Sequence, residues 1–180
     1  MIEREIMDKV TARLGSKVLA TYEFRGQCVV TIRPADLRDL LAWLRDDPEL
    51  DMKWLMDVGG VDYLGYSPGG NDDDDREWRF EVVYQLYSMS KNHRFRVKVA
   101  VNETECEVPS IWDMWGMANW MEREVWDLFG IKFPGHPNMR RIMCHDDFQG
   151  HALRKDYPIN KRQKLTVPAE NLLCEKVEWA

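Results

Sequence analysis

The sequence has few cysteines and lacks a long apolar run. Its four cysteines lie far apart and form no C-x-x-C pair, which argues against a local zinc site, an iron–sulfur site or a disulfide framework. No apolar run approaches the roughly 18 residues that span a membrane, and the start of the chain lacks the basic and apolar segments of a secretory signal. We expect a soluble or peripheral protein with reduced thiols in a cytosolic compartment: Cys28, Cys106, Cys144 and Cys174.

Several enzyme signatures are also missing. The sequence contains no glycine-rich dinucleotide turn, no H-E-x-x-H zinc motif and no G-x-S-x-G nucleophile motif. A chain without these motifs and without clustered cysteine ligands has no evident place to hold a redox cofactor of its own.

Charge is unevenly distributed along the 180 residues. The net charge is −6, which argues against general nucleic-acid binding. Residues 130–165, however, contain eight Lys or Arg against three Asp, so this segment carries +5 and the remainder −11. The apolar content of 44% suits one globular domain with an extended appendage.

Hydrophobic periodicity predicts an α+β fold. Apolar residues at helical spacing, ended by Gly15, Asp46-Asp47-Pro48 and Gly130, indicate three helices, and alternating segments indicate strands. This order predicts helices packed on one face of a mostly antiparallel sheet. The predicted helices are 3–14, 34–46 and 117–129, and the predicted strands are 17–24, 27–32, 54–58 (with a possible continuation to 64), 78–88 and 93–101.

Two biased segments have competing interpretations. The acidic run at residues 67–77 lacks the alternating spacing of a calcium-binding loop, so a solvated hairpin tip is favoured over a calcium site. Pro109-Ser110 predicts a short helical turn with Ser110 as its N-cap. The tryptophans that follow favour packing against the sheet or a partner over a platform for bases or a flavin: Trp112, Trp115, Trp120 and Trp126.

The helix at 117–129 has one buried stripe and one charged face. On a helical wheel Arg123 and Asp127 lie opposite the apolar residues, which predicts a surface ion pair. Glu122 instead lies within the apolar arc, where an unpaired carboxylate is costly. We expect Glu122 to pair with Arg140 or Arg141, or to be protonated.

Many residues from this helix onward carry a family resemblance. The stretch Asn119 to Ile131, NWMEREVWDLFGI, together with downstream matches, resembles the C subunit of the proton-pumping NADH:quinone oxidoreductase, respiratory complex I. Two departures are Gly116-Met117, where a Pro and a small residue are expected, and Ala152, where a Pro is usual. The downstream matches are Phe133, Gly135-His136-Pro137, Arg140-Arg141-Ile142, Asp147-Phe148, Gly150-His151 and Leu153-Arg154-Lys155-Asp156-Tyr157-Pro158.

The resemblance implies a structural subunit of the hydrophilic arm of that enzyme. Such a subunit holds no flavin and no cluster; FMN and the iron–sulfur clusters are in partner subunits, and the oxidoreductase activity belongs to the assembly. It packs beside the subunit that lines the quinone cavity and contacts other hydrophilic-arm subunits, on the cytoplasmic side of the inner membrane, without spanning it. The resemblance also implies two parts of the chain: a scaffold domain at residues 1–130 and an extended C-terminal arm at residues 131–180 that wraps the neighbouring subunit.

The chain's own chemistry agrees with a partner-binding arm. Residues beyond Gly130 are rich in proline and have little helical periodicity, so they cannot bury a core of their own and must lie along another surface. Their positive charge suits an acidic groove on a partner. The candidate interface or arm-anchoring residues are Glu122, Arg123, Glu124, Asp127, His136, Arg140, Arg141, Asp147, His151, Arg154, Lys155, Asp156 and Tyr157.

Two other functions remain as alternatives. A metal-dependent enzyme would use His136, His145 and His151, with Cys144 and the neighbouring aspartates, although no tight ligand spacing is present. An RNA-binding module would use the basic side of strand 93–101 and the basic arm, although the alternating aromatics of such modules are absent. That basic side consists of Arg94, Arg96 and Lys98.

Overall fold

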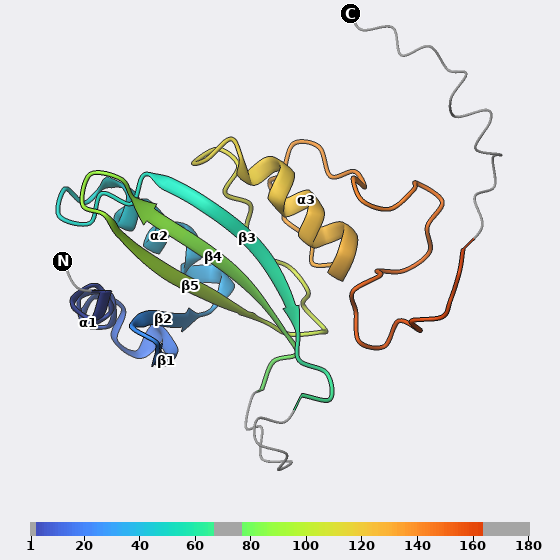
Figure 1. Cartoon of the computed structure of the whole chain (residues 1–180), viewed down its shortest axis with the longest axis horizontal. Helices are drawn as coiled ribbons and strands as arrows, with labels where there is room; N and C mark the ends of the chain where they lie inside the picture. Colours follow the sequence, from blue (N-terminus) through green and yellow to red (C-terminus); the bar gives the residue numbers. More distant parts are fainter. Residues whose placement is uncertain (1–2, 67–76, 164–180) are drawn as a thin grey trace, which may run out of the picture.

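A five-stranded sheet with helices α1, α2 and α3 forms the body of the protein (Figure 1). The computed structural model describes residues 3–66 and 77–163. Short 3-10 turns, Gly15–Lys17 and Pro34–Asp36, precede the first strand and the second helix. In chain order the elements are α1 (Glu3–Leu14), β1 (Val18–Phe24), β2 (Gln27–Ile32), α2 (Leu37–Asp46), β3 (Trp54–Asp62), β4 (Phe80–Ser88), β5 (His93–Val101) and α3 (Ala118–Phe129).

These elements confirm the predicted α+β fold, and the sheet is mixed. Its strand order is β1-β2-β5-β4-β3, with β5 in the centre. Three of the strand pairs are antiparallel, whereas β2 and β5 run parallel, with Val29–Ile32 beside Arg96–Val99. The acidic run predicted to be a hairpin tip lies almost entirely outside the described residues.

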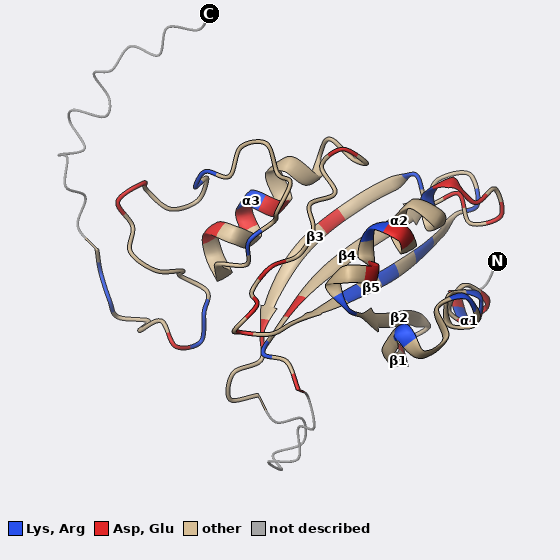
Figure 2. Ribbon diagram, turned by 180° about the vertical axis from the view of Figure 1, so that it is seen from behind, with Lys and Arg blue, Asp and Glu red and all other residues tan. Residues whose placement is uncertain are grey.

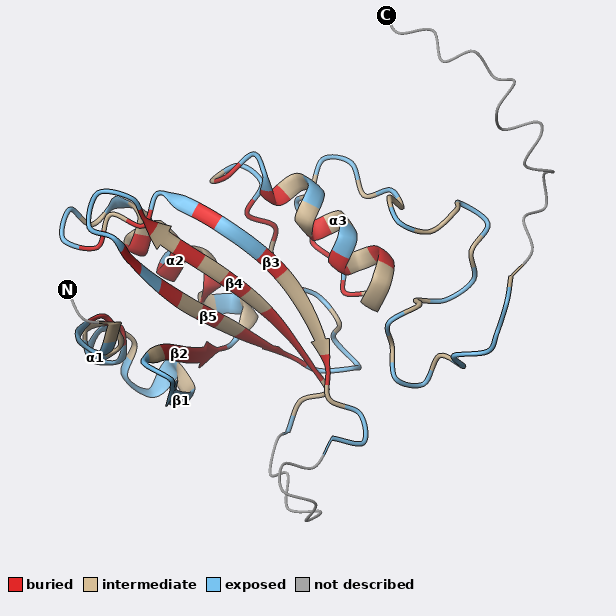
Figure 3. Cartoon of the chain, in the orientation of Figure 1, coloured by how far each residue is buried: buried red, intermediate tan, exposed pale blue. Residues whose placement is uncertain are grey.

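Alternation on the central strands creates the core. Phe80, Val82, Tyr84 and Leu86 of β4 are buried on the same side as the alternate apolar residues of β5. The helices contribute buried side chains to the same cluster, among them Ile6 of α1, Leu41 of α2 and Val125 of α3. The cluster thus confirms helices on one face of the sheet; α2 lies behind the sheet in Figure 1 and in front of it in Figure 2, and Figure 3 shows the buried positions along β4 and β5.

A glycine sets how closely α3 approaches the sheet. A Cβ atom added to Gly60 of β3 would lie 2.6 Å from Cδ2 of Phe129, the last residue of α3. Real carbon atoms do not pack that closely, so any side chain at position 60 would displace the end of this helix. The contact places the C-terminal end of α3 against the sheet's β3 edge.

The opposite face of the sheet carries a largely buried ion pair. Lys98 Nζ lies 2.7 Å from Glu81 Oε2 and 3.1 Å from the Tyr63 hydroxyl. Burial alone would lower the pKa of Lys98, but Glu81 and Tyr63 raise it above its ordinary value. Arg96 in turn donates to Gln27 at 3.1 Å. The strand 93–101 therefore presents a partly neutralised basic row, which is a poor footprint for RNA phosphates.

Candidate functional site

The segment after α3 folds back and caps the end of that helix. Gly130 adopts the left-handed conformation, with φ of 77°, and its N–H donates to Trp126 O. The last carbonyl groups of a helix have no hydrogen-bond donors within the helix. Here the arm supplies the donors. Leu153 N donates to Leu128 O at 3.0 Å, and Arg154 Nε donates to Phe129 O at 2.5 Å. Arg154 also places a cation at the negative end of the helix dipole.

His151 completes this cap. Its Nδ1 lies 2.9 Å from the Asp127 carbonyl oxygen, and a carbonyl can only accept, so neutral His151 carries its proton on Nδ1. Burial lowers the pKa of His151 below its ordinary value, which favours the neutral ring at pH 7. The histidine therefore acts as a structural donor between the arm and α3.

Gly130 has a second reason to be glycine. A Cβ atom added there would lie 2.5 Å from His151 Cδ2 and 2.8 Å from Arg154 Nη2. The residue is required both by its positive φ and by the space that the two arm side chains fill. The sequence predicts only that Gly130 ends the helix. It does not predict that arm side chains fill the space beside this residue.

Asp127 is the buried anchor of the arm. Its Oδ1 accepts from Arg141 Nη1 at 2.5 Å, and its Oδ2 accepts from the backbone N–H groups of Ile142, Met143 and Cys144 at 2.8 to 3.1 Å. Burial alone would raise the pKa of Asp127, but the Cys144 and Met143 amides, with Arg141, lower it below the ordinary value. Three consecutive amides and a guanidinium thus form a nest around one carboxylate.

This arrangement corrects the predicted surface pair of Arg123 and Asp127. Asp127 is fully buried because the arm covers the helix face that the wheel assigned to solvent. Arg123 instead donates through Nε to Arg140 O at 3.0 Å and through Nη2 to Arg141 O at 3.3 Å. Both residues hold the arm, through contacts other than the one predicted.

Glu122 does not pair with Arg140 or Arg141, so that prediction was wrong. The carboxylate is fully buried and accepts from Ser110 Oγ at 2.5 Å and from Ile111 N at 2.8 Å. Burial raises the pKa of Glu122 to about 7, despite these two donors. The Glu122 side chain contacts the turn before α3, whereas Arg140 and Arg141 lie along a different face of the helix. Of the two predicted states, a protonated Glu122 therefore fits the structure better than a Glu122 paired with arginine.

A second anchor ties the arm to the end of β3. Asp62 accepts from Arg79 Nη2 at 2.9 Å and from the backbone N–H of Lys155 at 2.9 Å. Burial alone would raise the pKa of Asp62, but these donors lower it. Arg79 also pairs with Glu103 at 2.6 Å and with Asp156 at 3.1 Å. The sequence analysis did not identify Asp62 and Arg79 as anchors, because neither lies in the stretch 119–158 that carries the family resemblance.

The other candidate residues vary in exposure. His136 contacts the Asn119 carbonyl oxygen at 3.0 Å, and Tyr157 stacks on Phe148 with ring centroids 5.6 Å apart. The remaining candidates are exposed to solvent: Glu124, Arg140, Asp147, Lys155 and Asp156. Ile131 and Phe133, the start of the predicted arm, belong to the same hydrophobic core as the sheet.

The three histidines of the metal alternative have separate environments. His136 and His151 bond to different backbone carbonyls, whereas both ring nitrogens of His145 are buried without a partner and the ring contacts Phe148. Within residues 3–66 and 77–163, no three His, Cys, Asp or Glu side chains come together as a metal site would require.

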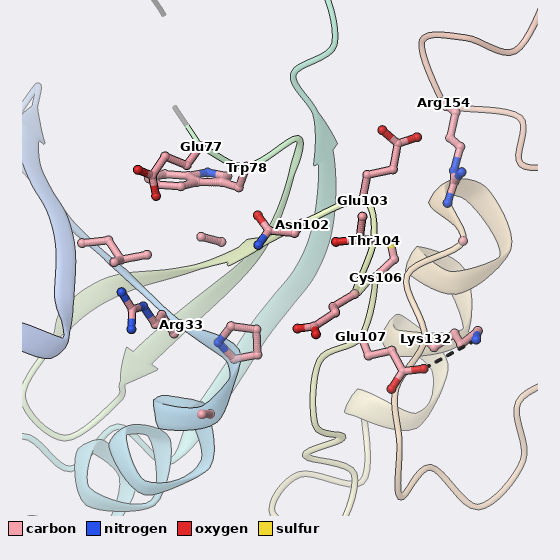
Figure 4. Close-up of a pocket in the computed structure, with 16 residues that line it drawn as sticks. Arg33, Glu77, Trp78, Asn102, Glu103, Thr104, Cys106, Glu107, Lys132 and Arg154 are labelled. Carbon is pink, nitrogen blue, oxygen red and sulfur yellow. Dashed lines mark hydrogen bonds and ion pairs between the residues drawn. The ribbon is translucent and has the colours of Figure 1, made fainter. Parts of the chain in front are cut away.

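A cleft of about 980 Å³ lies between the end of the sheet and the arm (Figure 4). Arg33 and Trp78 line one side, and the segment 102–107 with Lys132 lines the other. Its charges have mixed sign, and Lys132 lies 3.5 Å from Glu107. The described residues that line it include no histidine or serine, so the cleft does not assemble a nucleophile with a histidine base.

Solved structures share this fold. A trypsin-resistant fragment, residues 1–134, of Nqo5 superposes with a TM-score of 0.65 at 32% identity, covering 77% of this chain and 99% of the fragment. A chain of the membrane-bound sulfane sulfur reductase, an archaeal respiratory membrane complex, has a TM-score of 0.60 at 20% identity, covering 77% of that chain and 80% of this one, and shows the fold alone. The class is thus the α+β fold that these two chains share.

The sequence comparisons are more particular. The family described as "Respiratory-chain NADH dehydrogenase, 30 Kd subunit" matches residues 30–163, and the chain belongs to this family. The C subunit of NADH-quinone oxidoreductase from Roseiflexus castenholzii is 43% identical over 158 residues, which cover 88% of this chain and 85% of the relative. The C subunit from Geotalea uraniireducens is also 43% identical, over 84% of this chain and 85% of the relative. Within the described residues, no helix has the length and apolar content to cross a membrane.

Proposed function

We propose that this chain is a non-catalytic structural subunit in the peripheral arm of a proton-translocating NADH–quinone oxidoreductase. In this role it packs beside the subunit that lines the quinone cavity, on the cytoplasmic side of the inner membrane. It supports electron transfer from NADH through FMN and iron–sulfur clusters to quinone without holding any of these groups. Family membership and the relatives named as C subunits support the assignment to this assembly.

The observation that carries the structural role is the way the arm is held. Asp127 and Asp62 fix residues 141–155 from the inside, mainly through backbone amides. Arg141 and Arg154 bond inward to α3, but other basic side chains of the arm are exposed: Arg140, Lys155, Lys161 and Arg162. A segment anchored by its backbone and presenting cations outward is organised to bind an acidic surface of another subunit.

The described thiols support placing the redox groups elsewhere. Burial raises the pKa of Cys28, Cys106 and Cys144 above the ordinary thiol value. An iron–sulfur cluster is held by several cysteine thiolates together, and within the described residues these cysteines do not gather with other Cys, His, Asp or Glu side chains in a group of three that could hold a metal. Cys174 lies outside the described residues. The electron carriers therefore belong, in this proposal, to partner subunits.

Affinity purification tests the proposal. The tagged chain, expressed at its natural level, should recover a multi-subunit assembly with NADH–quinone reductase activity from detergent-solubilised membranes. The same chain purified alone should have no such activity, because it contributes no electron carrier. Recovery of the chain without other subunits, or turnover by the isolated chain, would contradict the proposal.

A further inference from the structure

Large apolar side chains are exposed around the start of α3. Trp112 is 39% exposed, Met117 53% and Trp120 63%. Met117 and Trp120 lie one turn apart at the beginning of the helix, where Trp120 N donates to Met117 O. Figure 3 shows exposed positions on this part of the chain and on the neighbouring stretch of the arm. We call Trp112, Met117 and Trp120 the indole surface.

Trp112 is exposed but not free to move. Its Nε1 donates to Gly135 O at 3.0 Å, and its backbone N–H lies 3.3 Å from Ser110 Oγ. The turn that carries Trp112 is held from below by the buried Glu122, which accepts from Ser110 and Ile111. A single conformation of the indole is therefore favoured before anything binds.

An arginine of α2 holds the same turn from the side. Arg38 donates to both carboxylate oxygens of Asp113, at 2.9 and 2.6 Å, and also to the Ser110 carbonyl oxygen. A bidentate pair fixes geometry more closely than a single contact. The turn is thus braced from two directions.

Trp120 is held by a cation–π contact. The guanidinium carbon of Arg123 lies 4.9 Å from the centroid of the Trp120 ring, within the range of a cation–π contact. Arg123 is itself fixed, because it donates to the carbonyls of Arg140 and Arg141. The arm therefore positions the second indole through the arginine.

Exposed tryptophans that are already ordered are the typical anchors of protein interfaces. Tryptophan is enriched among the residues that dominate binding energy, and a side chain ordered in advance loses less entropy when a partner binds. These ordering contacts leave 39% of Trp112 and 63% of Trp120 exposed within the chain itself. They are explained by a surface that completes its burial in an assembly.

The charges nearby indicate the chemistry of the partner. The Arg123 guanidinium bonds to carbonyl groups, and Arg140 is exposed; within the described residues neither forms an ion pair with a carboxylate. Asp113 is already paired with Arg38, and Glu124, one turn after Trp120, is exposed. An acidic group opposite Arg123 and Arg140 would complete the pairing.

We propose that the indole surface docks another subunit of the same assembly, one that presents an apolar pocket for the two indoles beside a carboxylate that reaches Arg123 or Arg140. This inference rests on the proposed function. It adds a specific contact, formed by α3 and the turn before it, to the general role of the basic arm.

Substitutions with a matched control test the docking surface. Trp112→Ala and Trp120→Ala remove the anchors, and Phe24→Ala is the control, since Phe24 is 62% exposed on β1 with an arginine 5.1 Å from its ring centroid. Each tagged chain is used to recover the assembly from solubilised membranes. Circular dichroism and thermal unfolding of the purified chains verify that each variant is folded.

We expect recovery to fall about tenfold or more for either tryptophan variant, and to stay at the wild-type level for Phe24→Ala. Trp120→Phe should restore most of the recovery, and Arg140→Glu should weaken it. If the folded double tryptophan variant recovers as much assembly as the wild type, the docking proposal is wrong while the proposed function stands. If the wild type recovers no assembly, both fail. Self-association of the isolated chain that is lost in Trp120→Ala would show instead that the surface binds a second copy.

Discussion

Replacing Glu122 by glutamine tests how a buried carboxylate behaves in this fold. The carboxylate is fully buried with two donors and no bonded cation, and its pKa is raised to about 7. Glutamine has the same shape and can still accept from Ile111 N, but it never carries a charge. We therefore expect Glu122→Gln to fold normally and to differ from the wild type mainly in its pH dependence.

The sign and size of the effect follow from linkage. A raised pKa means that the folded protein binds the proton more tightly than the unfolded chain, so this stabilisation is complete below pH 4.5 and is lost as the pH rises through about 7. The difference between 4.5 and about 7 corresponds to about 3 kcal/mol. Between pH 5 and pH 8 the wild type should lose roughly 2.5 kcal/mol more of its free energy of unfolding than Glu122→Gln does.

Urea unfolding of both proteins at several pH values measures this difference. The lowered pKa of His151 acts in the opposite direction in this window, because protonation of His151 destabilises the folded state as the pH falls. His151 is present in both proteins, so its effect cancels when the two curves are subtracted. Parallel curves for the wild type and Glu122→Gln from pH 5 to pH 8 would refute the account of Glu122.

The remaining predictions concern the arm and its anchors. Gly130→Ala should destabilise the protein by about 2 kcal/mol and speed trypsin cleavage after residue 130, because a left-handed backbone gains a Cβ that collides with the arm; unchanged cleavage would argue against the clash. Asp127→Asn should cost about 3 kcal/mol, seen in urea unfolding, since it leaves Arg141 unpaired. Gly60→Val should lower the unfolding midpoint by displacing Phe129, whereas Gly59→Val, with open space around it, serves as the control. The lowered pKa values of Asp62 and Asp127 predict stability that is present above pH 3.8 and lost as the pH falls further, which acid titration followed by circular dichroism checks.

Local patterns predicted the elements of the fold well. The alternation in β4 and β5 and the leucine spacing of α2 depend only on nearby residues, and the structure has each element within a few residues of its predicted bounds. The strand order was not predictable, because the parallel pairing of β2 with β5 joins segments some sixty residues apart, and no local signal specifies it.

Asp127, Arg123 and His151 were among the predicted candidates, and each joins α3 to the arm in the structure. Asp62 and Arg79 were missed, and the pairings predicted for Asp127 and Glu122 were wrong. The helical wheel placed Asp127 toward solvent because it considers one helix alone, whereas the arm covers that face and buries the carboxylate. The same reasoning recognised that Glu122 is buried but assigned it an arginine that follows another path. Whether residues 1–130 and 131–180 act as separate scaffold and arm in an assembly stays a prediction.

The central claim is that this chain has a structural role in an NADH–quinone oxidoreductase and no activity of its own. The most direct measurement is NADH–quinone reductase activity in membranes of the source organism after deletion of the gene. We predict that the activity is lost, that the wild-type gene restores it, and that the purified chain alone shows none. Full activity in the deletion strain, or NADH oxidation by the isolated chain, would contradict the account.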